Sequence, residues 1–317
     1  MRQRRLNVII VSLVLSGAAT ARAQTPPATD VTPPPGRAPH EVESPQPYVA
    51  PFGLRGTGAA TAVRAETAYG LNADTSATIV QYLTASYAPT KELSVFARGG
   101  WVDFMPSAGS SSTAFTNLAI GGLWAHRLAR RLRVAVVLGS GFPSGEGGGS
   151  SPDKGEAAAI AAGNLARSRL DGSTMFSPND LAPFVGGDVA WVSGGLTLQA
   201  EATLFELIRV RGSEADPDAS KTSLTLGMHA GYFLIPQLSI GIELRDQSFL
   251  STPAAVEAGK ISRSWVTVGG GPRVHLRLSR DVWFRPGLAF IQPLDDPSPA
   301  ISASSYHIVQ LDLPLTF

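Results

Sequence analysis

Short segments in which apolar and polar residues alternate recur from about residue 58 to the end of the chain. In LTLQAEATLF, for example, Leu196, Leu198 and Leu204 share one parity, while Gln199 and Glu201 share the other. Successive side chains of a β-strand point to opposite faces, so this period of two predicts strands. About twelve such segments can be distinguished. They begin near Thr61, Ser76, Leu93, Thr116, Leu132, Ala182, Leu196, Ser223, Leu238, Trp265, Asp281 and Ser305.

The connections between these segments alternate in length. Tight turns such as APTKE (88–92), LARR (128–131) and VSGG (192–195) follow the even-numbered segments. Longer connections follow the odd-numbered ones, and the longest spans residues 143–181. Tight turns at one end and long loops at the other are typical of outer-membrane barrels, in which the tight turns face the periplasm. The pattern places both ends of the strand region on the tight-turn side.

The direction of the apolar face distinguishes a membrane barrel from a soluble sandwich. A sandwich buries its apolar face, whereas a membrane barrel turns that face to lipid and pairs every strand. Charged residues make up only 16% of the chain, and the polar faces are rich in small residues. We therefore predict an all-β fold, an antiparallel up-and-down transmembrane β-barrel of about twelve strands. Aromatic residues near strand ends fit interfacial girdles: Tyr69, Tyr87, Trp101, Trp124, Trp191, Tyr232, Trp265, Trp283 and Tyr306.

The last segment carries a resemblance to a known family. Alternating apolar residues run to the end of the chain: Val309, Leu311, Leu313, Leu315 and Phe317. This ending resembles the C-terminal signature strand of Gram-negative outer-membrane β-barrels. The resemblance implies recognition by the outer-membrane assembly machinery and pairing of the last strand with the first. Pro314 departs from the pattern because it removes one donor from the strand ladder. No motif identifies a porin subfamily.

The N-terminus has the pattern of a secretory signal. The basic stretch MRQRR precedes an apolar stretch, and ARA ends at Ala23, so we expect a cleaved signal peptide over residues 1–23. The alternative, a membrane anchor, needs about 18–20 apolar residues, which is longer than this stretch. The chain contains no cysteine, and losing four arginines with the signal leaves a net charge of −3. We expect a bacterial outer-membrane location and no nucleic-acid partner.

Residues 24–57 are rich in proline and lack a repeating apolar pattern. Repeated proline favours extended backbone and supplies no core. We expect a disordered periplasmic tail here, with a spacer or peptide ligand as the alternative, and the barrel over residues 58–317.

If the apolar face points outward, the charged residues of the strands line the lumen. The principal candidates are Arg98, Glu201, Glu243, Arg245, Arg273, His275, Arg277 and Arg285. The same parity adds Arg64, Glu66, Arg133, Asp188 and Asp312. These residues could form the wall of a conduit for polar or anionic solutes. They could equally form a salt-bridge network that fills a narrow lumen.

The long connection over residues 143–181 follows the fifth segment and contains DKGEAAAIAAGNLARSRL, which favours a short helix. In general porins the loop after the fifth strand folds inward and narrows the pore. The alternatives here are an inward loop of this kind and a plain surface loop.

The sequence contains no motif for chemistry. None of the five histidines lies in a catalytic Ser–His context or at a metal-ligand spacing, and the glycine-rich stretches lack the lysine of a phosphate loop. We therefore predict a passive channel for small solutes that has no catalytic residue, metal or cofactor. The expected partners are outer-membrane lipids, lipopolysaccharide, the assembly machinery and the solutes. The alternatives are an occluded barrel with a structural or adhesive role and an outer-membrane lipid hydrolase.

Overall fold

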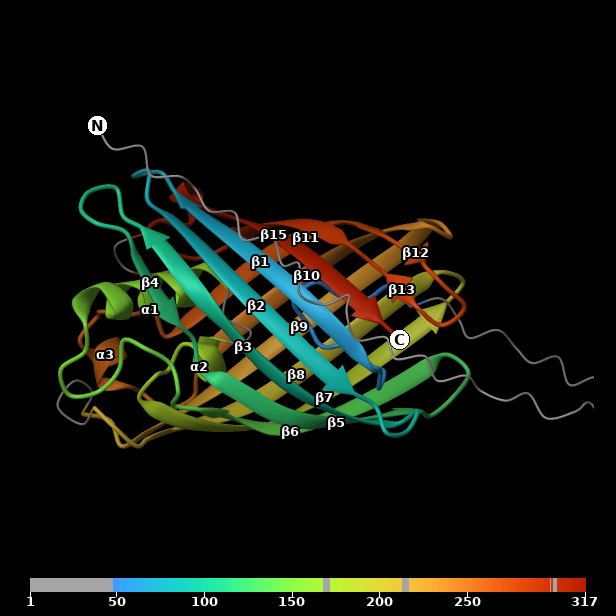
Figure 1. The fold of residues 1–317 in the computed structure, drawn as a ribbon, viewed down its shortest axis with the longest axis horizontal. Coiled ribbons are helices and arrows are strands. Elements are labelled where there is room, and N and C mark those ends of the chain that lie inside the picture. The colour runs from blue at the N-terminus through green and yellow to red at the C-terminus, as the bar shows by residue number, and fades with distance from the viewer. Residues whose placement is uncertain (1–47, 168–171, 213–216, 297, 299–300) are drawn as a thin grey trace, which may run out of the picture. The chain divides into compact units, whose positions relative to one another are not determined.

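The structure is a computed structural model that describes residues 48–167, 172–212, 217–296, 298 and 301–317. Residues 1–47, which include the expected signal peptide and most of the proline-rich segment, lie outside the described residues. In the described part, one antiparallel sheet closes on itself as a barrel of twelve strands (Figure 1). The predicted fold class is confirmed.

Fifteen strand segments build this barrel among the described residues. They are β1 Ala62–Asn72, β2 Ala77–Tyr87, β3 Leu93–Met105, β4 Ser112–Phe115, β5 Leu118–Arg127, β6 Leu132–Phe142, β7 Asp180–Ser193, β8 Leu196–Arg209, β9 Ser220–Ile235, β10 Leu238–Phe249, β11 Ser264–Val274, β12 Leu276–Arg277, β13 Trp283–Phe284, β14 Gly287–Pro293 and β15 Tyr306–Thr316. Three of the twelve barrel strands consist of two segments each. Both β4 and β5 pair with β3, both β13 and β14 pair with β15, and β12 continues β11.

Among the residues that the structure describes, three short helices and one 3-10 turn lie in the connections. They are α1 Lys154–Ala166, α2 Gly172–Met175, α3 Ala254–Glu257 and the 3-10 turn Ala303–Ser305. No helix in the described residues is both long enough and apolar enough to cross a membrane.

Closure is made by the first and last strands. β1 and β15 are paired continuously from Ala62 opposite Thr316 to Asn72 opposite Tyr306. The backbone N–H of Phe317 also donates to the carbonyl of Thr61. The predicted pairing of the last strand with the first is therefore confirmed, and Pro314 is accommodated within the strand opposite Arg64.

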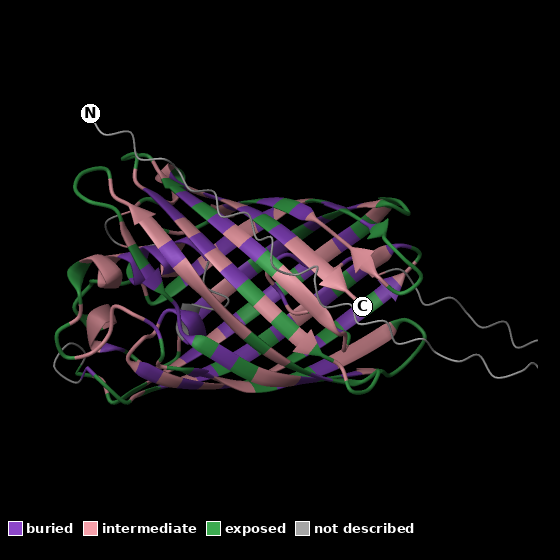
Figure 2. Cartoon of the chain, in the orientation of Figure 1, coloured by how far each residue is buried: buried purple, intermediate pink, exposed green. Residues whose placement is uncertain are grey.

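The apolar face of the wall points outward. Leu83, Leu138, Met228 and Phe290 are each more than half exposed, whereas polar residues of the opposite parity are buried. Figure 2 shows this alternation as a chequered pattern along the strands. Closure of the barrel provides hydrogen-bond partners for the backbone of every strand, and the apolar outer surface matches the hydrocarbon core of a bilayer. The inside-out arrangement expected from the sequence is present.

Two of the expected girdle aromatics point the other way. Trp265 and Tyr306 are buried, while Tyr69, Tyr87, Trp124, Trp191 and Tyr232 are exposed. Parity is the reason, because Trp265 lies eight residues before the buried Arg273 and Tyr306 lies six before the buried Asp312. The prediction that these two residues belong to a girdle was wrong.

Candidate functional site

The lumen contains two insertions, one from each end of the barrel. From the long-loop end, the described residues of the connection between β6 and β7, 143–167 and 172–179, fold inward and carry α1 and α2 (Figure 1). From the tight-turn end, residues 48–57 enter the barrel before β1 begins. We call residues 143–179 the inward loop and residues 48–57 the plug segment.

The inward loop packs on the wall through apolar contacts. Asp153 caps α1 by accepting hydrogen bonds from the N–H groups of Gly155 and Glu156, at 2.8 and 3.0 Å. The small buried face of α1 then lies against the inner face of the first strands. This cluster comprises Ala68, Val80, Tyr82, Val102, Ala114, Ala119, Ala159, Ile160, Ala166, Met175, Phe176, Ile291, Tyr306 and Ile308. Of the two alternatives that the sequence left open for this connection, an inward loop and a plain surface loop, the structure shows the inward loop, and it contains the short helix.

Polar side chains fix both ends of the inward loop. Asn117 lies in the break between β4 and β5; its amide donates to the carbonyls of Thr174 and Ser177 and its oxygen accepts from the N–H of Gly145. Arg211 donates to the carbonyls of Pro178 and Gly145. The break between β4 and β5 thus supplies Asn117, the residue that attaches the loop.

The plug segment corrects the expectation of a disordered tail for residues 48–57, whereas residues 24–47 lie outside the described residues. Its Val49, Phe52 and Leu54 side chains are each 1% exposed, although they lie in a proline-rich context. The segment reaches Glu201 and Gly227, near the middle of β8 and β9. The barrel interior supplies the apolar surface that residues 48–57 cannot supply for themselves.

Wall side chains hydrogen-bond to the backbone of the plug segment. Glu243 accepts from the N–H groups of Phe52 and Gly53, and Glu201 accepts from that of Arg55 at 2.8 Å. In the other direction, Arg273 donates to the carbonyl of Pro51. Thr197 accepts a hydrogen bond from the N–H of Val49, and Gln199 donates one to the carbonyl of Arg55. Gln310 and Arg64 both donate to the carbonyl of Phe52.

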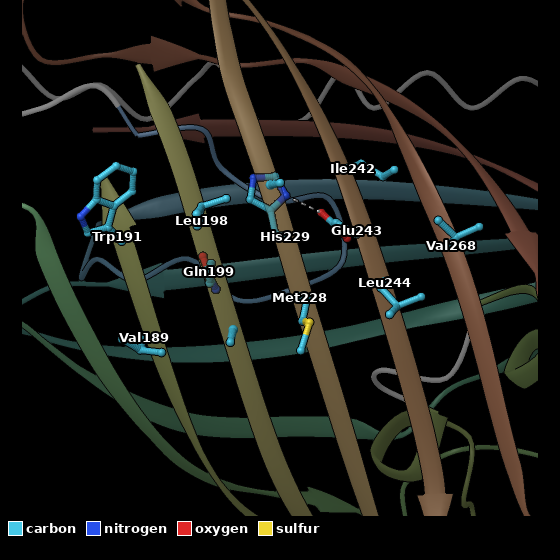
Figure 3. A pocket seen from close by; sticks show the side chains of 12 residues that line it. Val189, Trp191, Leu198, Gln199, Met228, His229, Ile242, Glu243, Leu244 and Val268 are labelled. Atoms are coloured by element: carbon cyan, nitrogen blue, oxygen red, sulfur yellow. Dashed lines mark ion pairs between the residues drawn. The ribbon is translucent and has the colours of Figure 1, made fainter. Parts of the chain in front are cut away.

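The predicted lumen residues separate into three groups. Glu201, Glu243, Arg245 and Arg273 are buried in the lumen and surround the plug segment. Figure 3 shows Glu243 beside His229 of the neighbouring strand, with Nδ1 of the ring 3.6 Å from the carboxylate. Arg98 lies further along the wall, 2.5 Å from Glu66.

The last three candidates lie towards the tight-turn end. His275 is buried, and Arg285 is half-buried and donates to the hydroxyl of Thr316. Arg277 is exposed and donates to the carbonyls of Ser279 and Arg280 within its own turn. The structure therefore places Arg277 outside the group that faces the plug.

Several buried charges of the wall are paired with one another or with the inward loop. Glu66 lies 3.4, 2.5 and 3.2 Å from Arg64, Arg98 and Arg167 respectively. Asp312 pairs with Arg64 at 2.6 Å and with Arg273 at 2.5 Å, and Glu243 pairs with Arg245 at 2.5 Å. Because Arg167 belongs to the inward loop, this network also connects the loop to the wall.

Two cavities lie beside the insertions in the described part of the barrel. The larger has a volume of about 260 Å³ and lies between the plug segment and the wall, lined by Arg64, Glu66, Ser94 and Glu201 among others. A smaller one of about 90 Å³ extends to Thr174 and Met175 of the inward loop. Both are lined by Arg55, Phe96 and Arg98, so the two cavities meet at these three side chains.

An apolar groove on the outer face is a separate feature. Val189, Trp191, Leu198 and Met228 line it, and Figure 3 shows these side chains along β7, β8 and β9. These residues belong to the lipid-facing parity, so we assign the groove to the membrane surface.

One serine–histidine pair is present in the described part. The hydroxyl of Ser239 lies 2.8 Å from Nε2 of His275, and the histidine ring packs on Phe233 at 4.6 Å between centroids. Ser239 is fully buried, and no carboxylate of the described residues forms an ion pair with His275. A hydrolytic triad needs an accessible nucleophile and a group that orients the histidine. The pair has the features of a structural contact.

No group of three histidine, aspartate or glutamate side chains within the described ranges is arranged to hold a metal ion.

Comparison with known proteins places the fold. No protein-family model matches the sequence, and no curated protein matches it. The solved COG4313 outer membrane channel from Pseudomonas putida F1 is similar, with a TM-score of 0.53 and 12% identity over 85% of this chain and 100% of that one. The NanC porin has a TM-score of 0.47 and 7% identity, over 80% of this chain and 98% of that one. The KdgM porin has a TM-score of 0.45 and 9% identity, over 80% of this chain and 99% of that one. This chain has the fold of outer-membrane β-barrels.

Proposed function

We propose that this protein is an outer-membrane channel through which small polar solutes, preferentially anions, diffuse passively. The main observation in support is a pair of adjoining cavities inside a closed barrel with an apolar exterior; both cavities are lined by Arg55, Phe96 and Arg98. The fold shared with the COG4313 outer membrane channel, and an apolar belt that requires a bilayer, support the outer-membrane location.

The size of the cavities limits the solute. A volume of about 260 Å³ holds roughly eight or nine water molecules at about 30 Å³ each. The smaller cavity holds about three on the same scale. Such a path suits inorganic ions and small carboxylates, and it excludes folded or oligomeric solutes while the plug segment is in place.

The charge of the path favours anions. Arg55, Arg64 and Arg98 line the larger cavity, against the carboxylates of Glu66 and Glu201. Rings of basic side chains select for anions in pores because each permeating ion loses part of its water shell. We therefore expect a permeability ratio that favours chloride over potassium.

Single-channel recording of the purified full chain in planar bilayers tests the proposal. We expect small, stable conductance steps and a reversal potential of anionic sign in a potassium chloride gradient. Arg98→Ala should lower the chloride preference several-fold, because Arg98 lines both cavities. Arg277→Ala is the matched control, because this exposed arginine contacts its own turn and the ring of Trp283, lines neither cavity and should leave the preference unchanged.

A folded barrel that conducts no ions and admits no solutes into liposomes would contradict the proposal. That result would favour an occluded barrel with a structural role, for which the two insertions in the lumen are the supporting observation. Folding is checked independently by the faster gel migration of an unheated barrel.

A further inference from the structure

The wall contains glycines at the positions where the plug's apolar side chains lie. A Cβ at Gly231 would stand 2.5 Å from Cγ1 of Val49, and one at Gly287 would stand 2.6 Å from Cε1 of Phe52. A Cβ at Gly227 would stand 2.8 Å from Cγ of Leu54. Each contact is shorter than van der Waals packing permits. β9 and β14 thus provide three recesses, one for each buried side chain of the plug segment.

The polar contacts beside these recesses recognise the backbone. Thr197, Glu201, Glu243, Arg273 and Gln310 all bond to backbone N–H or C=O groups of the plug segment. Bonds of this kind hold an extended chain in one register, while side-chain pockets supply specificity. The inner wall therefore has both components of a peptide-binding site.

Most charges of this site keep partners that belong to the wall itself. Glu243 pairs with Arg245, and Asp312 pairs with Arg64 and Arg273, without any contribution from the plug segment. Asp188 and Glu201 differ, because their ion pairs, at 3.3 and 3.9 Å, are with Arg55 of the plug. An empty site would therefore retain most of its buried charge pairing, which is the condition for a preformed site.

We propose that the inner wall of β8–β11, β14 and β15 is a binding site for an extended peptide, which the chain's own residues 48–57 occupy reversibly. Release of this segment opens a wider pore, and a peptide of the same sequence supplied in solution closes it. The inference concerns control of the pore and rests on the proposed channel function, but the binding step can be measured without conduction.

The first experiment fills a recess from the wall side. Gly227→Val should displace Leu54 and raise the fraction of time in a wider open state at least tenfold in single-channel records. Gly187→Val is the matched control, since Gly187 faces lipid on β7 and a Cβ there would meet only the carbonyl of Ala135 at 3.9 Å. Adding Leu54→Ala to Gly227→Val should restore the native closed fraction, because the smaller side chain leaves room for the valine.

The second experiment separates binding from conduction. A variant lacking residues 48–57 is folded in detergent, and a fluorescent peptide of the sequence YVAPFGLRGT is titrated against it by anisotropy. We expect saturable binding that is lost when the residues equivalent to Phe52 and Leu54 are alanine in the peptide. The unlabelled peptide, added to the tight-turn side of the deletion variant in a bilayer, should lower its current in a concentration-dependent manner.

Each outcome bears on the proposal. An unchanged open fraction in Gly227→Val, or a folded deletion variant that does not bind the peptide, would overturn the inference while leaving a conducting native protein as a channel. Peptide binding without any conductance in native or deleted protein would instead contradict the channel function and leave the peptide site standing. If the deletion variant does not fold, the Gly227→Val and Leu54→Ala pair decides the question.

Discussion

The plug segment and the inward loop both fill the lumen, but different interactions hold them. The inward loop is attached to strands at both ends and packs a helix on the wall through a shared apolar cluster. The plug segment places three apolar side chains in glycine recesses, and its backbone is held by polar side chains of the wall. The first arrangement resembles a protein core, and the second resembles a bound ligand.

This difference indicates which insertion can leave. Removing the loop would expose an apolar cluster to the lumen and would separate Arg167 from Glu66. Removing the plug segment would expose polar side chains that are largely paired within the wall. Exposing apolar surface to water is unfavourable in free energy, whereas paired polar groups are easily hydrated. We expect the loop to act as a fixed constriction and the plug segment as a movable one.

The largest expected effect comes from placing a charge in the loop's apolar contact. Ala159 of α1 is fully buried against the wall, whereas Ala161 of the same helix is exposed. Ala159→Asp should destabilise the docked loop by several kcal/mol, because a buried carboxylate without a partner loses its hydration. Limited proteolysis of the folded barrel should then cut within residues 143–179.

The control for this prediction is the same substitution two residues along. Ala161→Asp places the carboxylate in solvent and should leave the loop resistant to protease. Equal cleavage of both variants would show that the loop is not held by its apolar face, and the contrast with the plug segment would disappear.

A smaller effect is expected from neutralising the carboxylate that holds the plug backbone. Glu243 accepts hydrogen bonds from Phe52 and Gly53, and hydrogen bonds to charged groups contribute about 1.5–3 kcal/mol. Glu243→Gln should therefore raise the open fraction about tenfold to a hundredfold in single-channel records, since about 1.4 kcal/mol corresponds to a factor of ten. The loop's resistance to protease should not change.

Glu206→Gln is a suitable control because Glu206 accepts a hydrogen bond from Thr222 and does not contact the plug segment in the described structure. If both glutamines raise the open fraction equally, general weakening of the barrel would explain the result and the specific role of Glu243 would be refuted.

The third effect concerns selectivity. Arg55 belongs to the plug segment, lines both cavities and pairs with Asp188 at 3.3 Å. Arg55→Ala should reduce the chloride-to-potassium permeability ratio several-fold, because it removes the positive charge that pairs with the carboxylates of Asp188 and Glu201. Reversal potentials in a salt gradient measure the change.

Adding Glu201→Gln to Arg55→Ala should return part of the anion preference, because it removes one of those two carboxylates. A selectivity that is the same in wild type and Arg55→Ala would place the ion path away from the cavities beside the plug segment.

The wall could be predicted from the sequence because its structure is periodic. Lipid outside and polar groups inside impose a period of two on each strand, and all twelve predicted segments correspond to strands of the barrel. Parity also decides the direction of individual residues. Counting from Arg273 would have placed Trp265 inside, so that error came from choosing residue type over register.

The contents of the lumen could not be predicted in the same way. The plug segment has no periodic pattern, and its bonds connect residues far apart in sequence, such as Phe52 to Glu243 and Val49 to Thr197. A signal did exist in the residues, because Val49, Phe52 and Leu54 are unusually apolar for a disordered tail. The recesses at Gly227, Gly231 and Gly287 could be identified only once the strands were placed in register.

The smallest expected effect lies at the N-terminal end of the plug segment. The guanidinium of Arg133 lies 5.1 Å from the ring centroid of Tyr48, and the Tyr48 hydroxyl donates to Gln199 at 2.5 Å. A cation–π contact at a partly exposed site contributes about 0.5–1 kcal/mol. Arg133→Ala should therefore raise the open fraction only about twofold to fivefold. If the plug is released from this end first, Arg133→Ala will increase the opening rate and leave the closing rate unchanged. A changed closing rate would mean that Tyr48 docks before Phe52 and Leu54, so that release of the plug begins at its other end.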